Sequence, residues 1–181
     1  MLEGERDLVK KSKDGEVEAF GLLYDYYLPK IYRFVLVKVG QREEAEDLTH
    51  QAFLKAWQNI TKYEHKGYSF GSWLYKIARN TVYDHYRQTK AEFGIEDADN
   101  LGLLIMEEDV ESEAEKKIAL SKILEHLKIL KEVEEDVLIM RFVNDMPIKE
   151  VAATLGKTEG AVKLIQNRAL KNLKESISKE K

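Results

Sequence analysis

The sequence contains no cysteine, so the chain can form no disulfide bond, supply no thiolate nucleophile and bind no cysteine-ligated zinc. Its longest apolar runs are far too short to span a membrane. Charged residues from Glu3 to Lys11 make the N-terminus unlike a signal peptide. These absences predict a cytoplasmic chain with no membrane insertion.

The usual signatures of enzymes are also missing. The four histidines show no metal-ligand spacing, and no glycine-rich phosphate-binding loop is present. Acidic pairs such as Glu43-Glu44 and Glu134-Glu135 have the pattern of solvated helix faces. We therefore predict no catalytic residue, no metal site and no cofactor, and we do not expect an enzyme.

Charge is distributed unevenly along the chain. Ten acidic residues and no basic residue lie between Lys90 and Lys116, and although the net charge is −4, the residues outside this stretch sum to +6. Residues 91–112 also lack a sustained helical period, so we expect an acidic, flexible linker there. Its apolar centre, residues 101–106, suggests that the linker docks on another part of the molecule.

No segment alternates polar and apolar residues for long enough to favour a sheet. We predict an all-α fold of two small helical domains joined by the acidic linker. The first, residues 1–90, is expected to be a helical bundle. The second, residues 113–181, is expected to be a four-helix domain that contains a helix-turn-helix.

Cap and turn residues divide the first domain into four predicted helices. Asp14 is expected to cap the first helix, and Pro29 to begin a second helix that Gly40 ends. The third helix is expected at about residues 42–60 and the fourth at about 70–88. These boundaries place two polar faces, described next, on the third and fourth helices.

The predicted third helix has a broad apolar face and an opposite face that is polar except for one leucine. A leucine within a polar strip suits a protein-binding surface, although single exposed leucines are also common on solvated helices. The residues alone leave both interpretations open. The face comprises Asp47, His50, Gln51, Leu54 and Gln58.

Aromatic and basic residues are interleaved in the loop before the fourth helix and along one side of that helix. Rings can stack on unpaired bases while Lys and Arg follow the phosphates, which is typical of single-stranded nucleic-acid binding. Filling of a small core is the alternative, and it suits Tyr75 and Trp73, but it explains the whole set poorly. The set comprises Tyr63, Lys66, Tyr68, Phe70, Trp73, Lys76, Arg79, Asn80, Tyr83 and Arg87.

Residues 147–173 have the pattern of a helix-turn-helix. Pro147 suits the start of the first helix, Gly156 can take the positive φ that ends it, and Thr158 can cap the second. The second helix has a buried stripe at Val162, Ile165, Ala169 and Leu173. The basic and amide side chains of its opposite face favour a helix that enters the DNA major groove over an ordinary helical hairpin with a solvated basic face. That face carries Lys163, Leu164, Asn167, Arg168 and Lys171.

Taken in order, these motifs resemble those of bacterial RNA polymerase sigma factors of the sigma-70 family, in the compact extracytoplasmic-function (ECF, group 4) form. Residues 19–27 resemble the family's first conserved region, and residues 45–57 resemble its polymerase-binding helix. Residues 70–80 resemble its promoter-melting and −10-reading region, and residues 147–173 resemble its −35-reading domain. The resemblance covers nearly the whole chain.

The resemblance implies a factor that binds core RNA polymerase, directs it to promoter DNA and promotes melting. The third helix would dock on the clamp of the polymerase's largest subunit, the second domain would sit on the β-flap, and an anti-sigma factor would be a further partner. The implied polymerase-binding residues are Asp47, His50, Gln51, Leu54, Lys55 and Gln58. The implied −10 residues are the interleaved aromatic, amide and basic set, and the implied −35 residues are Thr158, Gly160, Lys163, Leu164, Asn167, Arg168 and Lys171.

One alternative class is a helix-turn-helix transcriptional regulator whose N-terminal half is a sensing or dimerisation domain. That half would need a ligand pocket or a self-complementary face, and the aromatic residues of its loop would be buried. Exposure of Tyr68 and Trp73 to solvent therefore helps to separate the two classes.

Overall fold

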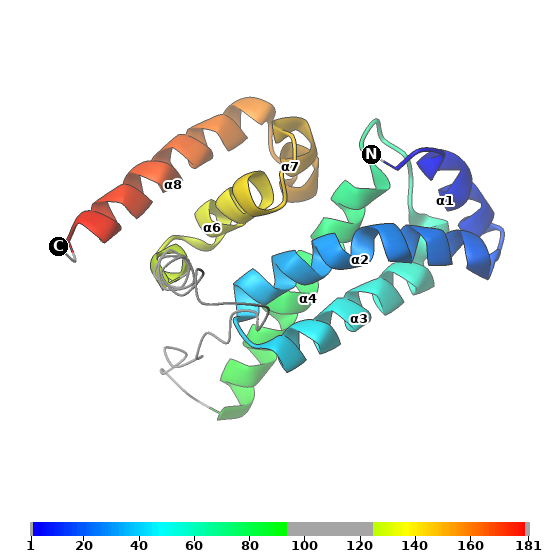
Figure 1. The fold of residues 1–181 in the computed structure, drawn as a ribbon, viewed down its shortest axis with the longest axis horizontal. Coiled ribbons are helices and arrows are strands. Elements are labelled where there is room, and N and C mark those ends of the chain that lie inside the picture. The colour runs from blue at the N-terminus through cyan, green and yellow to red at the C-terminus, as the bar shows by residue number, and fades with distance from the viewer. Residues whose placement is uncertain (1, 94–124, 180–181) are drawn as a thin grey trace, which may run out of the picture.

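The computed structural model describes residues 2–93 and 125–179, and every regular element in these ranges is helical, as predicted (Figure 1). The first range, which we call the N-terminal bundle, contains α1 (Glu5–Lys13), α2 (Val17–Val39), α3 (Arg42–Asn59), the 3-10 turn η1 (Ile60–Lys62) and α4 (Phe70–Phe93). The second range, the C-terminal bundle, begins with a helical turn at 125–128. It continues with α6 (Glu132–Leu138), the π-helical turn η2 (Ile139–Val143), α7 (Ile148–Leu155) and α8 (Glu159–Lys179).

Helix α2 replaces the two helices that the sequence predicts around Pro29. An interior proline removes one hydrogen bond and usually breaks a helix. Here α2 runs unbroken through Pro29, because a single apolar stripe continues on both sides of it and packs on α3 and α4. The predicted cap at Asp14 is also wrong, since this residue ends α1 and Glu16 precedes α2. Gly40 does end α2, with φ of 78°.

The predicted third and fourth helices are confirmed within a few residues of their expected ends. Helix α4 continues to Phe93, so the beginning of the expected linker (91–112) is helical. The rest of that linker, including its apolar centre at 101–106, lies outside the described residues. The same holds for residues 113–124, where the second domain was expected to begin.

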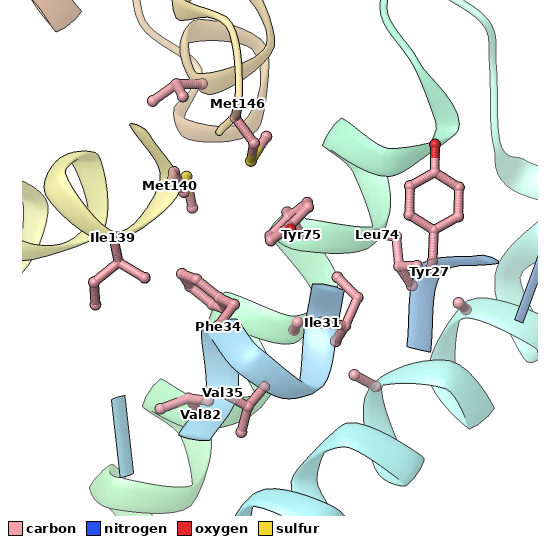
Figure 2. Packing of buried hydrophobic residues seen from close by; sticks show 14 of the residues in the cluster. Tyr27, Ile31, Phe34, Val35, Leu74, Tyr75, Val82, Ile139, Met140 and Met146 are labelled. Carbon is pink, nitrogen blue, oxygen red and sulfur yellow. The ribbon is translucent and has the colours of Figure 1, made fainter. Parts of the chain in front are cut away.

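A single apolar core runs through both bundles (Figure 2). Phe34 of α2 meets Tyr75 of α4 edge to face, with ring centroids 5.5 Å apart. Ile139 and Met140 of η2 are fully buried beside these rings. The two bundles predicted as separate domains are therefore packed against each other, and the contact is apolar at its centre.

The start of α4 is fixed by residues from α1 and α2. The Tyr27 hydroxyl donates to the buried Glu5 carboxylate, whose other oxygen accepts the Phe70 backbone N–H at 2.8 Å. Gly71 lies so close to the Tyr27 ring that a Cβ there would be 2.7 Å from Cε1. This close approach sets where α4 begins and thus where the preceding loop lies.

The helix-turn-helix predictions at residues 147–173 are confirmed. Pro147 precedes α7, and Gly156 ends it with φ of 62°. The Thr158 hydroxyl accepts the Ala161 N–H at 3.2 Å, as expected for a cap of α8. Val162 and Ala169 are fully buried, so one side of α8 is held by the bundle.

We predict that Gly71→Ala will lower the free energy of unfolding by about 1–3 kcal/mol, because the new methyl group must displace the buried Tyr27 ring. The matched control is Gly21→Ala in α2, where a Cβ meets nothing within 4 Å and the change should stabilise the helix by up to about 1 kcal/mol. Urea denaturation measures both. An unchanged midpoint for Gly71→Ala would contradict the packing argument.

Candidate nucleic-acid interface

Helix α3 presents its polar face to solvent. Asp47, His50, Gln51, Leu54 and Gln58 are exposed, and Leu54 keeps 56 % of its surface accessible. The opposite side of the helix is anchored in the core by residues that include Leu48 and Phe53. The face is therefore rigidly held and carries a large apolar side chain that the described residues leave uncovered.

Lys55 differs from the other predicted residues of this face. It is half-buried, and its Nζ donates to the Thr81 hydroxyl of α4 at 3.2 Å. This contact directs the ammonium group toward α4 and away from the centre of the exposed face. The prediction of Lys55 as a surface contact therefore needs correction: within this structure it joins α3 to α4.

The loop before α4 forms one wall of a cavity of about 340 Å³. Tyr68 is 39 % exposed and Trp73 is partly exposed at this cavity. Lys62, Lys66 and Lys76 also line it and give it a basic rim. An aromatic wall beside several ammonium groups can hold an unpaired base together with its phosphates.

Two of the predicted base-contacting aromatics, Phe70 and Tyr63, are buried, with 0 % and 6 % of their surface exposed. Their rings pack on each other and on Trp73, with centroids between 5.2 and 5.6 Å apart. Burial is the main reason that the pKa of Tyr63 rises to about 12. The prediction that Phe70 contacts DNA is wrong in this structure, because the ring lies in the core and supports Trp73 from behind.

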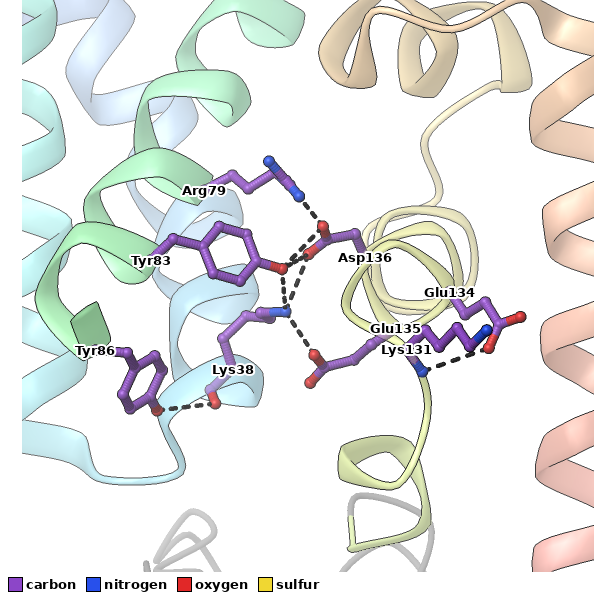
Figure 3. Close-up of polar contacts among 8 residues, drawn as sticks. All are labelled: Lys38, Arg79, Tyr83, Tyr86, Lys131, Glu134, Glu135 and Asp136. Carbon is purple, nitrogen blue, oxygen red and sulfur yellow. Dashed lines mark hydrogen bonds and ion pairs between the residues drawn. The ribbon is translucent and has the colours of Figure 1, made fainter. Parts of the chain in front are cut away.

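The side of α4 that was predicted to face DNA is partly covered by α6. Lys76, Asn80 and Arg87 are exposed to solvent. Arg79 and Tyr83, which were predicted to face DNA, instead contact Asp136 of α6 (Figure 3). The guanidinium Nε lies 2.5 Å from one carboxylate oxygen, and the phenol donates at 3.0–3.1 Å.

Lys38 completes this ion cluster and is not among the site residues predicted from the sequence. Its Nζ lies 3.0 Å from Asp136 and 2.5 Å from Glu135. Burial lowers the pKa of Lys38, but the two carboxylates outweigh burial and the pKa is raised overall. A lysine within the apolar stripe of α2, next to Val35 and Val39, was the signal that could have indicated a buried partner.

A second polar contact between the bundles lies at the start of α4. The Glu150 carboxylate of α7 accepts the Ser69 backbone N–H at 3.2 Å and the Ser69 hydroxyl at 2.5 Å, and it also accepts the Ser72 hydroxyl. The Thr154 hydroxyl donates to the Ser72 carbonyl at 3.1 Å. These contacts bring α7 to the rim of the cavity, which Ala153 also lines.

The predicted recognition face of α8 is exposed along its length. Leu164 keeps 73 % of its surface accessible, and Thr158 and Gly160 lie at the exposed start of the helix. The other exposed members of the face are Lys163, Asn167, Arg168 and Lys171. Basic and amide groups thus project together from a helix whose other side is buried.

Arg168 has a partner on α6 that was not predicted from the sequence. Its Nε contacts Glu134 of α6, which is 1 % exposed and also accepts a hydrogen bond from Asn172. The interpretation of Glu134-Glu135 as a solvated pair is therefore wrong. Glu134 joins α6 to α8, while Glu135 joins α6 to α2.

The described ranges contain neither a membrane-spanning helix nor a candidate metal site. None of the helices at residues 2–93 and 125–179 is long and apolar enough to cross a membrane. The same ranges contain no cluster of three or more His, Asp or Glu side chains suited to a metal ion.

Comparison with known proteins gives two family matches along the chain. Residues 23–92 match the model of Sigma-70 region 2, and residues 126–175 match that of Sigma-70, region 4. The chain is 33 % identical to the ECF RNA polymerase sigma factor BldN of Streptomyces coelicolor over 92 % of its length, and it spans 63 % of that relative. It is 26 % identical to SigW of Bacillus subtilis, another ECF RNA polymerase sigma factor, over 93 % of this chain and 94 % of the relative.

Two solved structures have the same fold. CnrH, in complex with the cytosolic domain of CnrY, matches with a TM-score of 0.74 at 19 % identity, over 98 % of this chain and 99 % of CnrH. RpoE of Bartonella quintana, in complex with the anti-sigma factor NepR, matches with a TM-score of 0.68 at 21 % identity, over 88 % of this chain and 96 % of RpoE. With the exposed α3 and α8 faces and the two family matches, these findings lead to one conclusion. The chain belongs to the sigma-70 family, as an RNA polymerase sigma factor of the ECF type.

Proposed function

We propose that this sigma factor binds core RNA polymerase through α3, reads the −35 element with α8 and holds the melted −10 element at the cavity beside α4. The observation that carries the proposal is the basic cavity with Tyr68 and Trp73 in its wall. The sigma-70 family is not an enzyme class, and the proposed activities of this chain are promoter recognition and strand separation. Transcription initiation would take place in the cytoplasm, at the chromosome.

The partial exposure of Tyr68 and Trp73 favours this proposal over a regulator with an N-terminal sensing domain. In a sensing domain these rings would close around a small ligand. Here they border a cavity whose rim carries three lysines, which suits a polyanionic strand. Since RpoE was solved with an anti-sigma factor, we also propose that an anti-sigma factor controls this chain.

The α3 face is proposed to dock on the clamp of the polymerase's largest subunit. Leu54 would lie at the centre of the contact, and Asp47 and Gln51 would lie beside it. An apolar centre with a polar rim is the usual composition of a protein interface. The rigid attachment of α3 to the core means that little conformational entropy would be lost on binding.

We predict that Leu54→Asp will weaken binding to core polymerase by more than about a hundredfold, because a charge would be buried without a partner at the centre of the contact. The matched control is Leu22→Asp on α2, since Leu22 is 57 % exposed and Leu54 is 56 % exposed. Fluorescence anisotropy with labelled factor measures both affinities. Equal affinity of the two variants would remove α3 as the docking face.

The cavity beside α4 is proposed to receive a base flipped out of the −10 element. Flipping costs a few kcal/mol of lost stacking, which an aromatic wall and hydrogen bonds to the base edge can offset. Tyr68 offers the wall, and Asn80 on the exposed side of α4 offers an amide. These contacts exist only after the strands separate.

We therefore expect Tyr68→Ala and Asn80→Ala to reduce open-complex formation by roughly tenfold while changing closed binding little, since stacking on one base contributes about 1–3 kcal/mol. A fluorescent reporter of strand opening measures the first step, and a gel-shift assay at low temperature measures the second. Thr89→Ala, at an exposed position further along α4, serves as the control. Equal losses in both assays would argue against a role in melting.

Helix α8 is proposed to enter the major groove at the −35 element. Its exposed face offers an amide at Asn167, an ammonium at Lys163 and the side chain of Leu164, which can pack on a thymine methyl group. Thr158 and Gly160 at its start lie where backbone N–H groups can meet a phosphate. The buried opposite side keeps the helix in place on the bundle.

We predict that Asn167→Ala will cost about 1–3 kcal/mol and relax the preference at one −35 position, as expected for a base reader. Lys163→Ala should weaken all −35 sequences alike and reduce the salt dependence, if it contacts a phosphate. Lys174→Ala, an exposed lysine later in α8, is the control. Competition binding to duplexes with single base changes tests all three. An unaltered −35 preference in Asn167→Ala, together with unchanged affinity in Lys163→Ala, would mean that another face reads the DNA.

A further inference from the structure

Among the described residues, Arg168 is the one basic group of the α8 recognition face that is paired with a buried carboxylate. Its Nε donates to Glu134 of α6, and Glu134 is 1 % exposed. Lys171 instead lies 3.8 Å from the exposed Glu175, and Lys163 contacts no carboxylate within the described ranges. The guanidinium of Arg168 is therefore fixed to the bundle, whereas the two ammonium groups are not.

The Glu134 carboxylate is itself held in place by three donors. Besides Arg168, Nδ2 of Asn172 lies 3.3 Å from Oε2, and the backbone nitrogen of Lys131 lies 3.4 Å from the same oxygen (Figure 3). Burial alone would raise the pKa of Glu134, but hydrogen bonds from Arg168 and Asn172 outweigh burial and lower the pKa overall. The group therefore stays an anion, and its position is set by α6 and α8 together.

The contact with Glu134 engages only the Nε of the Arg168 guanidinium. The side chain of Arg168 keeps 57 % of its surface exposed despite the ion pair. Within the described ranges, its two Nη groups donate to no other side chain or carbonyl. An arginine recognises guanine through two parallel hydrogen bonds to O6 and N7. With Nε occupied, Nη1 and Nη2 remain available for such a pair of bonds.

Pairing with Glu134 also changes the electrostatics of Arg168. A guanidinium beside a carboxylate adds little net charge, so it attracts the phosphate backbone only weakly. Its hydrogen-bond donors keep their directions, and direction is what distinguishes one base edge from another. Arg168 is therefore better suited to a base, and the unpaired Lys163 is better suited to a phosphate.

We propose that Glu134 is a positioning residue for −35 recognition, which holds Arg168 so that Nη1 and Nη2 bind one guanine of the element. This inference rests on the proposed role of α8 in the major groove. Glu134 acts through Arg168 and does not itself touch DNA. Its effect is to make a general cation selective for one base.

Binding of the holoenzyme to duplex promoter DNA tests the proposal. The probe is a labelled duplex that the unaltered holoenzyme selects from a library randomised over the −35 element, and the competitors carry single base changes. Arg168→Ala should reduce the preference for guanine at one position by about fivefold or more, and the loss should be confined to that position. A gel-shift assay at low temperature measures the closed complexes.

Glu134→Gln separates positioning from general support of the fold. The amide keeps the shape of the side chain and can still accept the Lys131 N–H, so α6 keeps its cap. Because a negative charge is removed, affinity for every duplex should rise by roughly fivefold at about 0.15 M salt, with a salt dependence steeper by about one counterion. The preference for guanine should nevertheless fall toward that of Arg168→Ala, because the guanidinium is no longer held.

The control is Glu175→Gln, which removes one negative charge from an exposed position of α8 and should leave the preference for guanine unchanged. In an Arg168→Ala background, Glu134→Gln should have no further effect on that preference, since Glu134 acts only through Arg168. Urea denaturation measures the stability of the Glu134 variant.

Arg168→Lys is a second test that leaves α6 unaltered. An ammonium keeps the charge but cannot form two parallel hydrogen bonds, so the preference for guanine should be lost while affinity for other duplexes is kept. Because Arg168 is exposed, this variant keeps the core intact and tests the proposal even if Glu134→Gln does not fold.

Loss of the guanine preference in both Arg168 variants, with tighter but less selective binding by Glu134→Gln, supports the proposal. Uniformly weaker binding by Glu134→Gln with its selectivity intact overturns it, as does a flatter salt dependence in Arg168→Ala without any change in base preference. If Asn167→Ala relaxes the −35 preference and the Arg168 variants do not, this inference alone fails. If none of these α8 variants alters the preference, the proposed role of α8 fails with it.

Discussion

The burial of the Asp136 carboxylate is the constraint on which the arrangement of the two bundles depends. An ionised carboxylate without solvent costs several kcal/mol unless cations and hydrogen-bond donors surround it. In this chain those groups come from the other bundle, as Lys38 of α2 and Arg79 and Tyr83 of α4. Removing either bundle would leave charges of the other without partners, so the cluster fixes how α6 lies on α2 and α4.

The apolar contact around this cluster explains why the bundles stay together. Phe34 and Tyr75 form a T-shaped pair that Met140 and Ile139 cover, and all four side chains are almost completely buried. Apolar burial supplies affinity without a fixed geometry, whereas the charges specify register.

One side of helix α4 packs in the core, and the other side is proposed to bind DNA. Leu74, Ala78 and Val82 hold it in the core. Its other side carries the groups proposed for DNA, and the cluster engages some of them while Lys76 and Asn80 remain exposed. A helix fixed so firmly on one side presents its remaining groups without loss of order, which is what recognition of a short unpaired strand requires.

Local patterns in the sequence determined the helical class, the bounds of α3, the helix-turn-helix with its Gly156 turn and Thr158 cap, and the exposure of Leu54 and Leu164. Each depends on periodicity or on neighbours within one helical turn, so residue order suffices to predict it. Only the tertiary structure decided that α2 passes through Pro29 and that Phe70 lies in the core. Those outcomes depend on partners distant in the chain. For the same reason the pairing of Arg79 with Asp136 could not be predicted, because the energy of a charged group is set by which opposite charge the fold brings beside it, and periodicity carries no record of that partner.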